Sequence, residues 1–170
     1  MINLTLKNKI SALYLCADIL DYPQNDYSEK LKSLQNIFDD DYDFELEDLE
    51  SEYLRIFSIE SSRLKCVPFA SWWIDGNMSG ISLSKISKFQ NDCGYGFDNE
   101  MVKKPLDHIS LMITFVAILL EDNRIKKIKE FSKFLTWLND FANSLDKATK
   151  IKTFKYATDI SLKIINSIKG

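Results

Sequence analysis

The side chains that could do chemistry are few in this sequence, and the first group of them is a short polar pair. Asp107 and His108 follow Pro105 and come directly before the most apolar run of the chain, residues 109–120. A carboxylate beside an imidazole at the rim of an apolar groove predicts contact with a cationic partner. The structural alternative is that Asp107 favours the first turn of a helix and that His108 is a hydrogen-bonded, partly buried side chain.

A second group lies in residues 67–76, which show no helical period and are unusually aromatic for a loop. Phe69, Trp72 and Trp73 either bind a partner or close one end of a helical bundle, because large aromatic rings serve both purposes. Asp75 adds a carboxylate beside the rings. The segment therefore predicts apolar contact with negative charge next to it.

The inventory for catalysis and metal binding is short. The sequence has one histidine, three cysteines without C-x-x-C spacing, no Gly-rich phosphate loop and no G-x-S-x-G or H-E-x-x-H motif. We therefore expect a protein that is not an enzyme and that holds neither a metal nor another cofactor. A nucleophilic pair of His108 with Cys16, Cys66 or Cys93 is an alternative, although a cysteine among apolar neighbours is usually a small core residue.

The elements that position these residues are predicted to be helices. Apolar residues recur at the i, i+3, i+4, i+7 spacing, and 5 glycines and 3 prolines are too few for the turns of an all-β fold. We expect one all-α domain over residues 1–170, a compact bundle of about seven helices. These helices fall near residues 10–20, 26–38, 46–57, 82–93, 105–120, 125–145 and 154–168. Gly94 suits the left-handed cap of the fourth, and Pro105 suits the first helical position of the fifth, which should be central because it is apolar all round.

Charge is nearly balanced overall but uneven along the chain. The 22 basic and 25 acidic side chains give a net charge of -3, so the strong positive field of a nucleic-acid binder is absent. Residues 39–60 hold ten acidic side chains against one basic, and residues 124–170 hold eleven basic against four acidic. The acidic stretch favours attraction of a basic peptide, and the lysine-rich stretch leaves contact with anionic membrane or nucleic acid as an alternative.

The expected compartment is the cytoplasm. The apolar stretch at residues 10–20 is interrupted by Asp18 and lacks the layout of a secretory signal. Residues 109–120 are shorter than the roughly 20 residues that a membrane span requires. An odd number of cysteines also fits a reducing compartment.

Four short motifs, in order and with matching spacing, resemble the TorD/DmsD/NarJ-type chaperones, the redox enzyme maturation proteins that assist molybdenum-cofactor oxidoreductases. They are residues 20–23 (LDYP), 53–57 (YLRIF), 67–73 (VPFASWW) and the PLDH sequence at 105–108, which follows Gly94. The likeness runs through about residues 10–120. It implies an all-α, TorD-like cytoplasmic chaperone that binds the twin-arginine leader and the apo-form of a DMSO-reductase-family enzyme until its molybdopterin cofactor is inserted.

The resemblance also implies a peptide-binding site. The family motifs place Tyr53, Phe57, Pro68, Ser71, Trp72, Asp107 and His108 in this site, and the chemistry of the loop adds Phe69, Trp73 and Asp75. The chain departs from the family at Met112, where a Glu is common four residues after the histidine. Any role of that carboxylate is therefore absent or moved. The loop at residues 67–80 favours formate dehydrogenase as the client.

The expected partners are the twin-arginine leader and the apo catalytic subunit of a molybdopterin oxidoreductase, without nucleic acid. Transient association with the membrane fits this role, and the chain is either a monomer or a domain-swapped dimer. A helical adaptor or regulatory protein that touches anionic membrane or nucleic acid through its lysine-rich C-terminal helices is the alternative function. A nucleotide hydrolase comes third, because nucleotide binding has been suggested within the resembled family but this chain lacks a phosphate loop.

Overall fold

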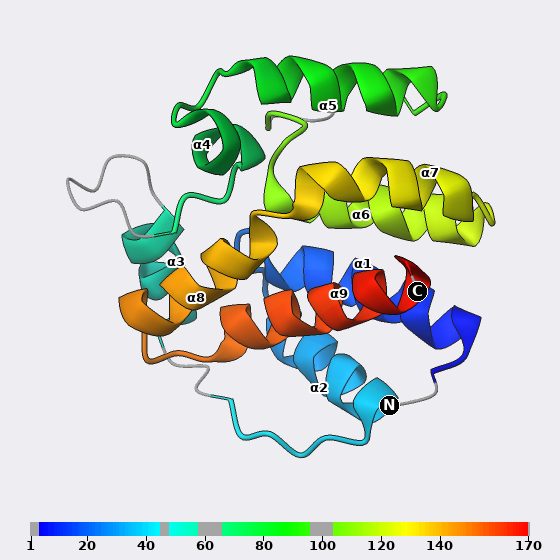
Figure 1. Ribbon diagram of the computed structural model, residues 1–170. Coiled ribbons are helices and arrows are strands. Elements are labelled where there is room, and N and C mark those ends of the chain that lie inside the picture. Colours follow the sequence, from blue (N-terminus) through cyan, green and yellow to red (C-terminus); the bar gives the residue numbers. More distant parts are fainter. Residues whose placement is uncertain (1–3, 45–47, 58–65, 96–103, 170) are drawn as a thin grey trace.

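The computed structural model describes residues 4–44, 48–57, 66–95 and 104–169, and the regular structure in these ranges is helical (Figure 1). A single isolated bridge pairs Phe69 with His108, and these ranges contain no longer strand. The helices are α1 (Leu6–Ile19), α2 (Tyr27–Phe38), α3 (Leu49–Phe57), α4 (Ala70–Asp75), α5 (Ile81–Asp92), α6 (Ile109–Glu121), α7 (Ile125–Phe131), the 3₁₀ turn η1 (Ser132–Leu135), α8 (Leu138–Ala148) and α9 (Thr153–Lys169). The all-α prediction is confirmed.

Helix α6 lies at the centre of the fold, as its apolar sequence predicts. Nine of its 13 residues are buried, and it packs against α1 and α7. Helix α1 in turn contacts α2 and α9. Figure 1 shows the resulting order, from α5 through the α6–α7 pair and the α1–α9 pair to α2. Within the described ranges, no helix is both long enough and apolar enough to cross a membrane.

Several helix ends follow from the local sequence. The hydroxyl of Thr5 accepts a hydrogen bond from the amide of Asn8 at 3.2 Å and caps the start of α1. Helix α1 ends shortly before Pro23, whose ring disfavours helical geometry in the residue before it. Gly94 follows α5 with a φ of 86°, which confirms the predicted left-handed cap because a side chain would be strained there.

The described residues form nine α-helices and one 3₁₀ turn, rather than about seven helices. One addition is α4, in the aromatic segment that lacks a helical period. The other comes from residues 125–145, which form α7, η1 and α8 instead of one helix. In a 3₁₀ turn, residues three apart lie on the same side. The local change thereby lets Phe131, Phe134 and Trp137 all face the core, where each is buried.

Helix α6 begins four residues later than predicted. Pro105 is not at its first helical position, because the peptide turns there and the His108 amide donates to the Pro105 carbonyl at 3.0 Å. His108 is extended, with φ −64° and ψ 137°, and α6 starts at Ile109. Asp107 therefore precedes the helix instead of lying in its first turn, which leaves its carboxylate available to another element.

Candidate functional site

The site is organised around a crossing of two distant segments. The Ala70 amide donates to the Asp107 carbonyl at 3.0 Å, and the Ile109 amide donates to the Pro68 carbonyl at 2.8 Å. These two hydrogen bonds flank the bridge of residues 69 and 108 and fix the segment before α4 beside the segment before α6. Backbone pairing thus brings together two motifs that are almost 40 residues apart in sequence.

Asp107 acts as a cap for α4. Its Oδ2 accepts a hydrogen bond of 2.9 Å from the amide of Ser71, one of the first amides of that helix, which have no partner within the helix itself. The side chain is fully buried. Its Oδ1 and the hydroxyl of Ser71 are both buried without a hydrogen-bond partner among the described residues. The predicted carboxylate is therefore held inside the protein, where it stabilises the start of α4.

His108 caps α6 with its ring. Its Nδ1 lies 2.7 Å from the hydroxyl of Ser110 and accepts from the Ser110 amide at 3.3 Å, so the proton of the neutral ring belongs on Nε2. The ring meets Phe69 edge-on, with 5.0 Å between ring centroids. Burial, and then the nearby ammonium of Lys104, lower the pKa of His108 to about 4, although the Asp21 carboxylate acts in the opposite sense. The imidazole is consequently neutral at pH 7.

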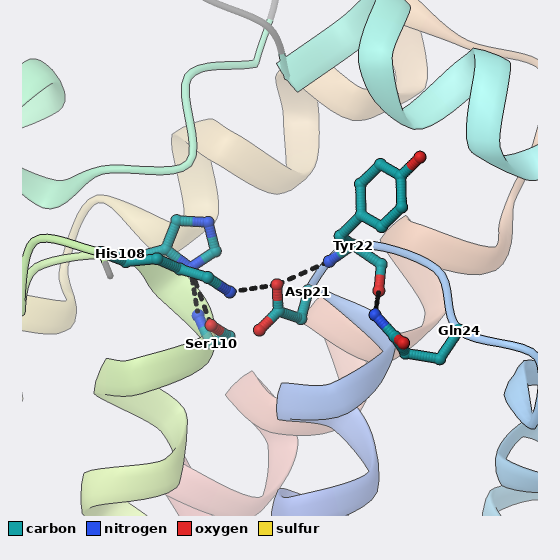
Figure 2. Close-up of polar contacts among 6 residues, drawn as sticks. Asp21, Tyr22, Gln24, His108 and Ser110 are labelled. Carbon is teal, nitrogen blue, oxygen red and sulfur yellow. Dashed lines mark hydrogen bonds and ion pairs between the residues drawn. The ribbon is translucent and has the colours of Figure 1, made fainter. Parts of the chain in front are cut away.

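Asp21 lies beside this pair, at the end of α1. Figure 2 shows Asp21 between Tyr22 and the His108–Ser110 contact. Its Oδ1 accepts from the Tyr22 amide at 2.6 Å and forms an ion pair with Lys104. The sequence motifs included residues 20–23 only as part of the family resemblance and did not assign Asp21 to the site. The signal was a carboxylate directly after a helix that stops before proline.

The predicted aromatic residues of α3 and α4 meet through α8. The ring centroids of Tyr53 and Phe57 are 4.7 Å apart, and Phe57 stacks on Phe141 at 6.0 Å. Trp73 meets Phe141 edge-on, with 6.2 Å between ring centroids, and donates its indole N–H to the Val67 carbonyl at 2.7 Å. Trp73 therefore closes one end of the bundle, and sequence patterns did not reveal Phe141 as its partner.

The second tryptophan and the last predicted carboxylate lie farther along α4. Trp72 is half-buried. Asp75 accepts from the amide of Ser82 at 2.8 Å and from its hydroxyl at 2.9 Å, so it caps the start of α5. Gly80 passes so close to this carboxylate that a side chain there would collide with it. Asp75 thus joins α4 to α5 and does not face the other predicted carboxylate.

The ten predicted residues therefore occupy four places. The crossing contains Pro68, Phe69, Ser71, Asp107 and His108; the aromatic row contains Tyr53, Phe57 and Trp73; Trp72 lies on α4, and Asp75 lies at the joint with α5. Met112, where the family commonly has Glu, is fully buried in α6. An apolar side chain fits that surrounding, as a carboxylate without a partner would be costly there.

The cysteines and acidic residues offer little for catalysis or metal binding. All three cysteines are buried as thiols, and burial raises the pKa of Cys16 to about 12. Such a thiol is almost entirely protonated at neutral pH and is a poor nucleophile. In the part of the chain that the structure describes, no three His, Cys, Asp or Glu side chains gather as metal ligands would.

The fold belongs to a known all-α class. A crystal structure of a protein described as a candidate redox enzyme maturation protein from Archaeoglobus fulgidus has the same fold, with a TM-score of 0.69 over 91% of this chain and 92% of that chain. The two sequences are 21% identical.

The sequence gives the family. The model of the nitrate reductase delta subunit family matches residues 21–148, and the chain belongs to this family. It is also 27% identical over 117 residues to the chaperone protein TorD from Actinobacillus succinogenes, across 68% of this chain. The matched part spans 59% of the length of that relative. These matches confirm the resemblance to TorD/DmsD/NarJ-type proteins, and the family match contains all ten predicted residues.

Proposed function

We propose that this protein is a cytoplasmic chaperone that binds the twin-arginine leader and the apo-form of a molybdenum oxidoreductase and assists cofactor insertion before export. The observation that carries the proposal is the family match over residues 21–148, because it covers the crossing, the aromatic row and Asp21 together. The TorD relative supports the same kind of activity, since that protein is a named chaperone. Such a function requires binding and release, without catalytic turnover.

The chemistry of a twin-arginine leader matches features of the described surface. The leader presents two guanidinium groups followed by an apolar segment, so its binding site needs carboxylates beside apolar side chains. Asp48 and Glu50 are exposed at the start of α3. Asp21 is partly exposed, and the hydroxyl of its neighbour Tyr22 donates to Glu50. Trp72 offers a half-buried ring on α4. These groups supply charge and apolar contact without a cofactor.

The predicted site residues take different roles in this proposal. The crossing of residues 67–70 with residues 107–109 sets the position of α4 through the hydrogen bonds of Asp107 and the ring contact of His108. Trp73 ties α4 to the core through its ring contact and its indole N–H. Both indoles are half-buried, but Trp72 is not among the residues packed against the core, so its ring is the one left for an apolar segment. Asp107 and His108 therefore serve binding by holding the surface in place.

The alternative of a basic binding face has weaker support. Several lysines of α7 to α9 and their connections are already paired with acids of the same region: Lys127 with Glu130 at 2.7 Å, Lys152 with Asp146 at 3.0 Å and Lys155 with Asp159 at 2.5 Å. These pairs reduce the positive field that attraction to anionic lipid or nucleic acid requires. The paired lysines are therefore better described as part of a solvated surface, while the eleven basic against four acidic side chains of residues 124–170 leave the other basic residues as its excess charge.

Calorimetric titration of the purified full chain with twin-arginine leader peptides tests the proposal. The peptides come from formate dehydrogenase, nitrate reductase and S- or N-oxide reductases, each beside a variant with both arginines replaced by lysine and a scrambled control. We expect tight binding of one leader, and binding weaker by about tenfold for its lysine variant because the bidentate guanidinium contacts are lost. Failure to bind any leader or any apo-enzyme would contradict the proposal.

A further inference from the structure

The three carboxylates near the site differ in what their oxygens already bind. Asp107 is fully buried and accepts from the Ser71 amide, and Asp75 accepts from both the amide and the hydroxyl of Ser82. Asp21 has a side chain that is 35% exposed, and both of its polar contacts use Oδ1. Among the described residues, its Oδ2 makes no hydrogen bond. Asp75 is exposed but uses both oxygens, whereas Asp21 combines a partly exposed side chain with an oxygen that accepts no hydrogen bond among the described residues, so we take Asp21 as the carboxylate open to a guest cation.

A cation of the chain itself already sits on Asp21. Lys104, 83 positions along the sequence, pairs its ammonium with Oδ1, and its side chain is 34% exposed. Both charges influence the pKa of His108, in opposite directions, so the pair lies next to the imidazole that caps α6. A half-exposed pair of this kind contributes roughly 0 to 1 kcal/mol to stability. Water or another cation can therefore replace Lys104 at low cost.

The surroundings of Asp21 suit a guanidinium better than an ammonium. Tyr22 follows Asp21 directly (Figure 2). Its ring meets Tyr53 edge-on, with 5.5 Å between ring centroids, and its hydroxyl donates to Glu50. Guanidinium groups stack on aromatic rings and bind one carboxylate through two parallel N–H donors, which an ammonium cannot do. Beside these residues, a hollow of about 450 Å³ between the starts of α2 and α3 has Glu50 in its lining. A second carboxylate thus lies on the same side of the protein.

We propose that Asp21 receives a guanidinium of the leader, and that Lys104 occupies this carboxylate in the unbound protein until the leader displaces it. The inference rests on the proposed function, because it concerns the same leader. The incoming arginine gains a two-donor contact that uses the open Oδ2, and the released ammonium of Lys104 returns to water. Lys104 thereby acts as an internal competitor that favours arginine over lysine in the guest.

Four variants of the full chain test this exchange by calorimetry with the leader that the wild-type protein binds. Asp21→Asn keeps the size of the side chain but removes its charge, and we expect affinity to fall about 10- to 100-fold, in the range of a lost charged hydrogen bond. Lys104→Met removes the competitor, and we expect affinity to rise about two- to fivefold. Lys104→Arg holds Asp21 with a guanidinium and should weaken binding. In Asp21→Asn combined with Lys104→Met, the gain from Lys104→Met should disappear.

The pair of Lys88 and Asp92 provides matched controls. It is an exposed i,i+4 pair on α5, so Lys88→Met and Asp92→Asn change the charge equally without touching the site. Two outcomes overturn this inference but leave the proposed function intact, provided that the wild type binds the leader. In the first, Asp21→Asn lowers the affinity no more than Asp92→Asn does. In the second, Lys104→Met and Lys88→Met change the affinity equally. Absence of leader binding by the wild type overturns both. Circular dichroism identifies any variant that fails to fold. If Lys104→Met does not fold, the leader affinity of Lys104→Arg tests the inference instead, and an affinity equal to that of the wild type contradicts it.

Discussion

The burial of His108 has a direct consequence for how stability depends on pH. Burial and the Lys104 ammonium lower the pKa of His108 to about 4 in the folded chain, whereas an unfolded chain has the ordinary value of about 6.5. The unfolded state therefore takes up the proton first as the pH falls. The contribution of the neutral ring to stability is complete above about pH 6.5 and is lost progressively between about pH 6.5 and pH 4.

The size of this loss follows from the two pKa values. Between about pH 7 and pH 5, linkage gives a decrease of about 2 kcal/mol in the free energy of unfolding from His108 alone. Because the chain has one histidine, no other imidazole contributes in this window. Carboxylates begin to titrate near its lower end, so a variant without the imidazole has to be compared with the wild type.

Urea unfolding of the wild type and of His108→Gln at several pH values measures the difference. We expect the wild type to lose about 2 kcal/mol more than His108→Gln over the window, because glutamine does not titrate. Nitrogen NMR of the single imidazole gives an independent check, with a neutral ring protonated on Nε2 at about pH 5.5. Equal pH slopes for the two proteins, or an imidazole that titrates near pH 6.5 in the folded state, would refute the reasoning.

Two further predictions concern how α4 is held. Asp107→Ala removes the acceptor of the Ser71 amide and should lower the free energy of unfolding by about 1 to 3 kcal/mol, whereas Asp107→Asn keeps an acceptor oxygen and should cost less; equal losses in urea unfolding would contradict the capping role. Trp73→Ala removes the contact with Phe141 and the bond to a backbone carbonyl, and should cost about 2 to 4 kcal/mol, with Trp72→Ala costing clearly less. A larger thermal destabilisation by Trp72→Ala than by Trp73→Ala would contradict the assignment of Trp73 as the indole that packs against the core.

Helices that bury one face could be predicted from the sequence because their signal is local. The apolar spacing in α1, the left-handed glycine after α5 and the unbroken apolar run of α6 each depend on residues within a few turns. The same reasoning missed the split between α7 and α8. The apolar side chains at 131, 134 and 137 are three residues apart, a spacing that fits both an α-helix and a 3₁₀ turn. Which of the two forms depends on packing against the rest of the core, where all three side chains are buried.

The candidate site depends on partners that sequence spacing does not reveal. Helix α4 has no helical period of its own, and its first amides find their acceptor in Asp107, 36 residues away. The sequence predicted that Asp107 faces a cation, but the turn at Pro105 directs its side chain into the protein, where it is buried. Asp21 differs from Asp107 in the opposite direction, because the sequence did not mark it as a site residue. Folding brings Lys104 and His108 next to this aspartate, which makes it part of the candidate site.

The hydrogen bond from Ser71 to Asp107 also sets the order in which the chain can acquire structure. A six-residue helix is far shorter than the roughly 12 to 15 residues that an isolated helix needs for even marginal stability. During synthesis, residues 70–75 emerge well before residue 107, so α4 has no acceptor for its first amides until the start of α6 has been made and docked. The aromatic surface of α4 therefore takes shape late, and a chain that ends before Asp107 lacks it altogether.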